Sequence, residues 1–180
     1  MFNQLGTMNE QVVESIIDMN SEIAENSNNN NEGKEITLES RFGEVTVDVE
    51  RAIFFPQGIC GIPEKMHFAI IDMPSKNLGD FKLLQCLNDP SLSFVVFPLS
   101  LENDLIEKQD LVDCCEVTKI NSDGLLTLLI ASIQRAPKED GTIDIGVTLN
   151  VRAPIIVDTK DQSAMQYVFS SNKYAIRHEL

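Results

Sequence analysis

Short apolar runs, some alternating with polar residues and others continuous, follow one another from residue 35 almost to the end of the chain. Alternation with a period of two places every second side chain on the same face, which is the pattern of a half-buried β-strand. Turn-forming residues such as Asn88-Asp89-Pro90 separate the runs at intervals of roughly ten residues, the spacing of an antiparallel sandwich or a small closed barrel. We assign strands to residues 36–38, 45–49, 53–55, 68–71, 81–87, 94–97, 125–133 and 143–152. Nothing favours alternating βαβ units, so we predict an all-β body.

The last of these runs ends in an unusual segment, in which a strand with polar residues on one face is interrupted by a proline: Thr148-Leu149-Asn150-Val151-Arg152-Ala153-Pro154. On a strand, Asn150 and Arg152 would share one face, and Pro154 would interrupt pairing because it has no backbone donor. The two polar side chains could form hydrogen bonds with the polar groups of a partner. They could equally anchor one end of a barrel by bonding loop carbonyls, since Arg offers five donors. Asp89 has the same two readings, as a residue presented to a partner or simply as part of a turn before Pro90.

The first 34 residues follow a different pattern. Between Met8 and Glu25, apolar residues recur with spacing near that of a helix, and acidic residues lie between them. An Asn-rich stretch, residues 27–33, then reads as a flexible linker. We therefore divide the chain into an acidic N-terminal extension, helical or disordered, at residues 1–34 and a β domain at residues 35–180. The helix could pack on the body or on a partner.

Net charge narrows the class of partner. The chain carries 28 acidic residues against 14 Lys and Arg, a formal charge of −14. Nucleic-acid binding depends on neutralising phosphates, so direct contact with DNA or RNA is disfavoured, whereas a basic protein partner fits. Alternatively, the acidity only keeps an abundant protein soluble. The start of the chain has no basic, apolar leader, and the longest apolar run, Leu125–Ala131, is too short to span a bilayer, so we expect a cytoplasmic protein.

Recognisable catalytic chemistry is absent from the sequence. No nucleophile elbow, phosphate-binding loop or zinc motif occurs, and the four cysteines lack metal-ligand spacing. We expect reduced thiols, no metal and no cofactor. We place the adjacent Cys114 and Cys115 on a strand, one buried and the other exposed, and assign weak helical spacing to residues 101–111. A thiol-dependent enzyme using Cys86 or Cys60 is one alternative, and a generic β interaction module is another.

Four motifs stand in order along the body, and together they carry a family resemblance. They are Ile53-Phe54-Phe55-Pro56-x-Gly58-Ile59-x-Gly61, Phe81-x-x-Leu84-Gln85-Cys86 with Asn88-Asp89-Pro90-x-Leu92-x-Phe94-Val95-Val96, Thr148-Leu149-Asn150-Val151-Arg152-Ala153-Pro154-Ile155, and Gln166-Tyr167-Val168 with Tyr174-x-x-Arg177. In this combination the body resembles the FliW family of flagellar assembly factors. Departures from the family pattern are Cys86, Val151, the Ile62-Pro63-Glu64 segment and the N-terminal extension.

The resemblance implies a non-catalytic binding protein with a small antiparallel β-barrel-like domain, monomeric when free. Proteins of this family bind flagellin in the cytoplasm and antagonise the RNA-binding translational repressor CsrA. Flagellin export would then free the factor to bind CsrA and relieve repression of flagellin translation. We expect Asp89, Asn150 and Arg152 to be exposed partner contacts, with Gln85 as their support.

Overall fold

The computed structural model describes residues 35–74, 78–100, 104–121, 124–137 and 141–180. The N-terminal extension of the sequence analysis lies outside these residues, as do residues 101–103 at the start of the expected helical run.

The first two strands form the expected hairpin. β1 (Glu35–Ser40) pairs antiparallel with β2 (Gly43–Asp48), and a 3₁₀ turn, η1 (Val49–Arg51), follows. Gly43 at the tip has φ +106°, a value that L side chains rarely adopt. Buried Leu38 and Val47 on the inner face pack with Leu83. The hairpin therefore packs against the outer face of the main sheet.

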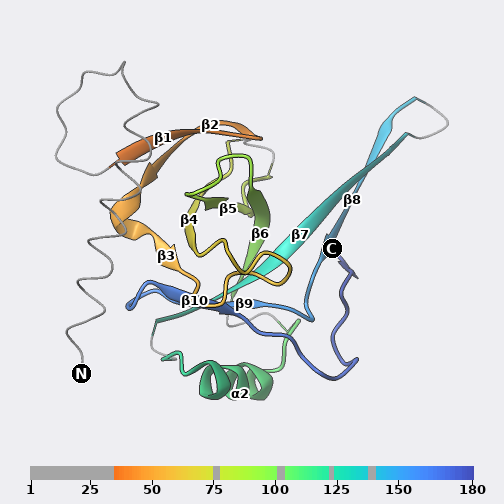
Figure 1. Cartoon of the computed structure of the whole chain (residues 1–180). Helices are drawn as coiled ribbons and strands as arrows, with labels where there is room; N and C mark the ends of the chain where they lie inside the picture. The colour runs from red at the N-terminus through yellow and green to blue at the C-terminus, as the bar shows by residue number, and fades with distance from the viewer. Residues whose placement is uncertain (1–34, 75–77, 101–103, 122–123, 138–140) are drawn as a thin grey trace.

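Seven strands close into a barrel (Figure 1). In spatial order they are β7 (Leu125–Pro137), β6 (Ser93–Leu99), β5 (Lys82–Cys86), β4 (His67–Asp72), β3 (Ile53–Phe54), β10 (Ser163–Gln166) and β9 (Ile155–Asp158). Pairing of β7 with β9 completes the circle. All neighbours are antiparallel except β10 and β3, which form a single parallel pair, Ser163 with Phe54. The predicted all-β, barrel-like fold is confirmed.

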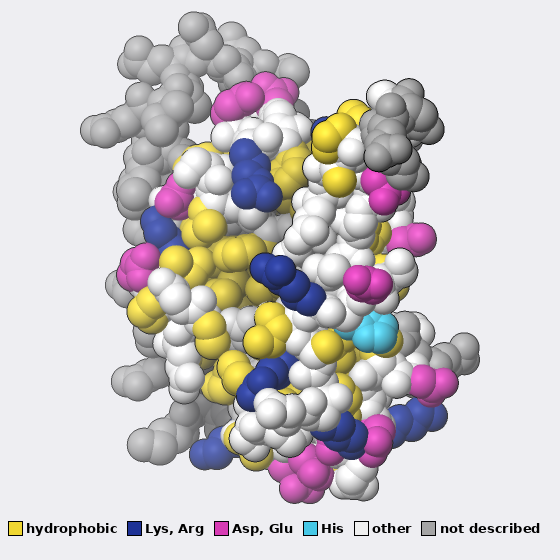
Figure 2. Space-filling model, turned by 90° about the vertical axis from the view of Figure 1, so that its right-hand side faces the viewer, with side chains coloured by type: hydrophobic (Ala, Val, Ile, Leu, Met, Phe, Trp, Pro, Cys, Tyr) yellow, Lys and Arg dark blue, Asp and Glu magenta, His cyan; other side chains and the backbone are white. Residues whose placement is uncertain are grey.

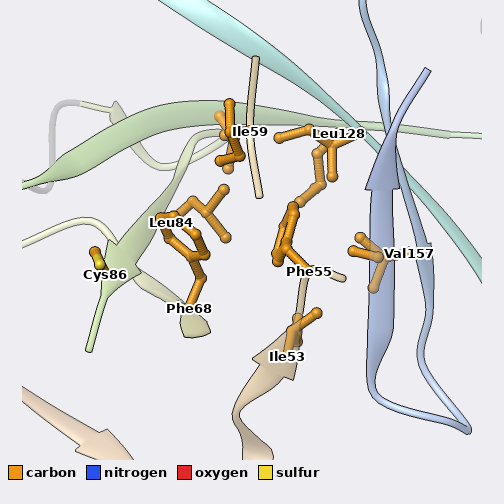
Figure 3. Close-up of a cluster of buried hydrophobic side chains, with 11 residues drawn as sticks. Ile53, Phe55, Ile59, Phe68, Leu84, Cys86, Leu128 and Val157 are labelled. Carbon is orange, nitrogen blue, oxygen red and sulfur yellow. The ribbon is translucent and has the colours of Figure 1, made fainter. Parts of the chain in front are cut away.

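Apolar side chains fill the barrel (Figure 3). Phe55 lies at the centre with its ring 4.9 Å from that of Phe68 in an edge-to-face contact, and Leu84, Leu128 and Val157 point toward it from three other strands. Each of these side chains is fully buried. Because these side chains fill the interior, it is a packed core and not a ligand cavity. Burial of one such side chain contributes about 1.5–3 kcal/mol to stability.

β7 continues beyond the barrel. Its first residues pair with β9 and β6, and Ala131–Pro137 pair with β8 (Ile143–Leu149). Figure 1 shows these two segments as a ribbon that projects from the body, and we call residues 132–137 and 141–147 the arm. β11 (His178–Glu179) adds to β8 near its base. The predicted strand through residue 152 was wrong, because β8 ends at Leu149 and the chain turns as it approaches Pro154.

One helix, α2 (Lys108–Thr118), covers the opposite end of the barrel from the β1–β2 hairpin (Figure 1). It begins later than the expected run at 101–111 and ends at Lys119, whose φ of 59° is left-handed. Placing Cys114 and Cys115 on a strand was wrong. Neighbouring residues on a helix are only about 100° apart, so both can face the body, and both are buried.

Candidate functional site

Gln85 holds the Asn88–Leu92 turn from beneath. Its side chain is fully buried, and Nε2 donates to the carbonyl oxygens of Cys86 (2.9 Å), Pro90 (3.1 Å) and Leu92 (3.2 Å). One buried amide thus bonds to the carbonyl of Cys86, before the turn, and to two carbonyls within the turn. Gln85 therefore braces the turn and has no exposed surface with which to touch a partner, and its role as a support for partner contacts stays a prediction.

Asp89 lies on the turn itself and is one-third exposed. Lys65 Nζ donates to Asp89 Oδ2 (2.9 Å), and Ser91 Oγ donates to Oδ1 (2.6 Å). These bonds, from Ser91 first and then from Lys65, hold the pKa of the Asp89 carboxyl below its usual range. The same ion pair raises the pKa of Lys65. Asp89 therefore ties the turn to the loop that contains Lys65.

That loop, residues 56–66, reaches across to the Asn150–Pro154 segment. Cys60 N donates to Gln166 Oε1 (2.9 Å), and Gln166 Nε2 donates to the Ala153 carbonyl oxygen (3.2 Å). Gly58 makes the tight turn possible, since its φ is +61° and a Cβ there would lie 2.6 Å from Pro63 Cα. The sequence motifs at residues 53–61, 81–96 and 148–155 are therefore joined at one end of the barrel.

Asn150 and Arg152 are half-buried and bonded within the chain. Asn150 Oδ1 accepts a hydrogen bond from the Ala153 N–H (3.1 Å), closing the turn after β8. Arg152 donates from Nε to the Phe169 carbonyl oxygen (3.3 Å) and from Nη1 to Asn172 Oδ1 (2.9 Å). These bonds match the bracing role weighed in the sequence analysis. A contact with a partner stays a prediction for both residues.

The fourth motif also serves the fold. Lys173 Nζ lies 2.7 Å from Asp110 Oδ2 and 2.8 Å from Glu107 Oε2, and Tyr174 Oη bonds to Asp110. The Lys173 hydrogen bond is the first cause that lowers the pKa of Asp110, and burial is the first that raises the pKa of Tyr174. This cluster fastens the C-terminal segment to the beginning of α2.

The three buried thiols have raised pKa values, which disfavours their action as nucleophiles. Burial raises the pKa of Cys86 and Cys115, and raises that of Cys114 to about 12. A reactive cysteine needs a lowered pKa, which favours the thiolate. His67, near Cys86, has its own pKa lowered by burial. Within the described ranges, no group of three His, Cys, Asp or Glu side chains is placed to hold a metal ion.

Sequence reasoning missed two apolar surfaces. The first is a groove of about 820 Å³ beside α2, lined by Leu111, Val112, Cys115, Ile120 and Leu125 among others, with Lys108 and Lys119 beside them. We call it the α2 groove. Its only signal in the sequence was the weak helical spacing near residue 105, which ended too early to include these side chains.

The second surface is the apolar face of the arm. Ile143 and Ile145, 63% and 59% exposed, lie on the same face as Ile133 and Val147 by strand alternation and register. Arg135 is paired with Ile145 and adds one charged side chain to this otherwise apolar face. Figure 2 views the molecule from the side of the arm, where apolar side chains gather in a hollow with Lys and Arg around it. Large exposed aliphatic side chains on a projecting ribbon are typical of a protein-binding surface. In the part of the chain that the structure describes, no helix is long and apolar enough to cross a membrane.

Comparison with known proteins extends over the same body. The family model described as FliW protein matches residues 36–180. The flagellar assembly factor FliW of Alkaliphilus metalliredigens is 29% identical over 140 residues, covering 76% of this chain and 80% of that protein. Its namesake in Oceanobacillus iheyensis is 27% identical over 145 residues, covering 76% and 87%. A crystal structure of the flagellar assembly factor FliW shares the fold, with a TM-score of 0.55 at 20% identity over 81% of this chain and 95% of that one. The chain belongs to the FliW family.

Proposed function

We propose that this protein is a non-catalytic cytoplasmic factor that binds flagellin and antagonises CsrA, thereby coupling flagellin export to flagellin translation. The observation that carries the proposal is the FliW match across residues 36–180, which spans the whole described body. The relatives that match it are flagellar assembly factors by name. Flagellin and CsrA are the partners that the family resemblance implies.

Charge supports the CsrA part of the proposal. The net charge of −14 gives the protein a negative field that attracts a basic, RNA-binding protein and speeds encounter. An interaction that depends on such a field weakens as salt screens it.

Shape supports the flagellin part. The exposed aliphatic face of the arm offers a site for the apolar surface of an unassembled subunit, which must be shielded until it is exported. Ile145 is well suited as an anchor because it is 59% exposed and lies midway along the arm.

The test is a pull-down with purified flagellin and purified CsrA, each alone and then in competition, at low and at high salt. We expect both to be retained, flagellin to displace CsrA, and CsrA retention to fall at high salt. Retention of neither protein would overturn the proposal.

A matched pair of variants locates the flagellin surface. Ile145→Asp places a charge on the apolar face of the arm, and Gln134→Asp places one on the opposite face of the same ribbon. We expect Ile145→Asp to weaken flagellin binding about thirtyfold or more, the size of a hot-spot loss, and Gln134→Asp to leave it unchanged. Equal effects of the two variants would remove the arm from the interface.

A further inference from the structure

The α2 groove is an apolar depression whose lining is ready to accept another apolar surface. Leu111, Cys115 and Ile120 form its floor and are buried, whereas Val112 at its mouth is 48% exposed. The open groove and the exposed valine at its mouth leave apolar surface in contact with water. A second apolar surface that covered the groove would remove this area from water and so stabilise the protein.

Two lysines lie at the edge of the α2 groove. Lys108 and Lys119 both line it, and neither forms an ion pair with any residue that the structure describes. By contrast, Lys65, Lys82 and Lys173 are each paired with a carboxylate. One acidic residue, Glu116, lies in the lining between them. The groove therefore favours an occupant that is apolar on one face and acidic at its borders.

The sequence of residues 8–25 has the pattern that such an occupant needs. At 100° per residue on a helix, Val12, Val13, Ile16, Ile17, Ile23 and Ala24 fall within an arc of about 140°. Glu10, Glu14, Asp18, Glu22 and Glu25 fall within the opposite arc of about 120°. An isolated helix of this length is marginal in water, so docking of its apolar face would stabilise it.

The linker between this segment and β1 is long enough for the segment to reach the α2 groove. Residues 26–34 link the segment to β1 and span about 30 Å when extended. A compact body of this length has a radius of gyration of about 15 Å, so the linker and the helix together can pass from the β1 end of the barrel to α2. Because the occupant is tethered, its effective concentration at the groove is of millimolar order.

We propose that residues 8–25 dock as an amphipathic helix in the α2 groove of the same chain, with Lys108 and Lys119 facing its acidic borders. The docked segment covers the groove, and a protein partner that uses the α2 face must displace it. The family match begins at residue 36, so this contact is a property of the present chain beyond the proposed flagellin and CsrA binding.

The test uses the full chain and two matched pairs of variants. Ile16→Asp charges the apolar face of the segment, and Ser15→Asp adds the same charge on its polar side. On α2, Val112→Glu alters the groove mouth, whereas Val117→Glu alters an exposed valine on the same helix that does not line the groove. Two of the four positions are in the extension, and the other two are exposed on α2, so none belongs to the packed core. Amide exchange of β5 and β6 serves as the reference for correct folding.

The readouts are hydrogen exchange of the α2 amides and the alkylation rate of Cys115 relative to Cys60. We expect Ile16→Asp and Val112→Glu to raise both rates by about tenfold, because local opening becomes easier, and the two control variants to leave them unchanged. Unchanged rates in Ile16→Asp would overturn the proposal. Protection that increases with protein concentration would overturn it in favour of a second copy as the occupant.

Discussion

Arg152 and Asn172 are joined by a hydrogen bond of 2.9 Å from Nη1 to Oδ1, which fixes the segment after β8 to the C-terminal part of the chain. The same guanidinium reaches the Phe169 carbonyl oxygen. A side chain of the third family motif thus holds the segment that carries the fourth. These hydrogen bonds give Arg152 a structural role within the chain that does not depend on a partner.

Replacing Arg152 by Ala should lower the free energy of unfolding by about 1–2 kcal/mol, because at least one half-buried acceptor loses its donor. Arg152→Lys should lose nearly as much, since an ammonium cannot reproduce the planar fork. Urea denaturation measures both. Unchanged stability combined with lost partner binding would identify Arg152 as a contact and not a brace.

The hydrogen bonds that Ser91 and Lys65 donate to the Asp89 carboxylate should make stability depend on acid pH. The folded-state pKa of Asp89 lies below its unfolded value, so the stabilisation is present above the ordinary pKa of Asp and is lost as pH falls through the folded pKa. Asp89→Asn removes this term and should flatten the acid limb of a plot of unfolding free energy against pH. If the limbs of the two proteins superimpose, the bonds to the Asp89 carboxylate do not contribute to stability.

Gly58 and Gly61 should respond differently to substitution by Ala. Both have positive φ, +61° and +93°, so both variants incur the left-handed penalty of about 1–2 kcal/mol. At Gly58 the new Cβ would also meet the Pro63 and Ile62 backbone at 2.6–2.7 Å, whereas at Gly61 it meets nothing within 4 Å. Thermal unfolding should therefore show the larger loss for Gly58→Ala, and equal losses would contradict the packing of this loop.

Thiol reactivity should separate the exposed cysteine from the buried ones. Cys60 is exposed, whereas Cys86, Cys114 and Cys115 are buried and have raised pKa values. Alkylation of the native protein near neutral pH should modify Cys60 first, as mass spectrometry would show, and leave partner binding intact. Rapid modification of Cys86 with loss of a measurable activity would instead favour a thiol-dependent enzyme.

The fold could be predicted only as far as its local patterns reach. Alternation and a glycine turn were enough for the β1–β2 hairpin, and short apolar runs bounded by turn residues were enough for the central strands, because those signals lie within a few residues of each other. Closure of the barrel depends on pairing β7 with β9 and on the single Ser163–Phe54 bridge, which join residues far apart in the sequence. The short β9 and β10 carry too few residues to show a period.

The sequence drew attention to single residues, whose contact with a partner stays a prediction, but it did not indicate the exposed apolar surfaces. The turn at Asp89 and the segment at Asn150 follow from residues whose chemistry is local. The arm and the α2 groove depend on which side chains the tertiary structure leaves uncovered, and alternation cannot distinguish an outer face from a buried one. Ile145 reads in the sequence as a core residue.

The central claim is tested most directly by following the binding of CsrA to its target RNA while this protein and then flagellin are added. Fluorescence anisotropy of labelled RNA reports the bound fraction. The account predicts that the protein lowers the fraction of RNA bound to CsrA and that flagellin restores it. A bound fraction that does not change when the protein is added would contradict the account.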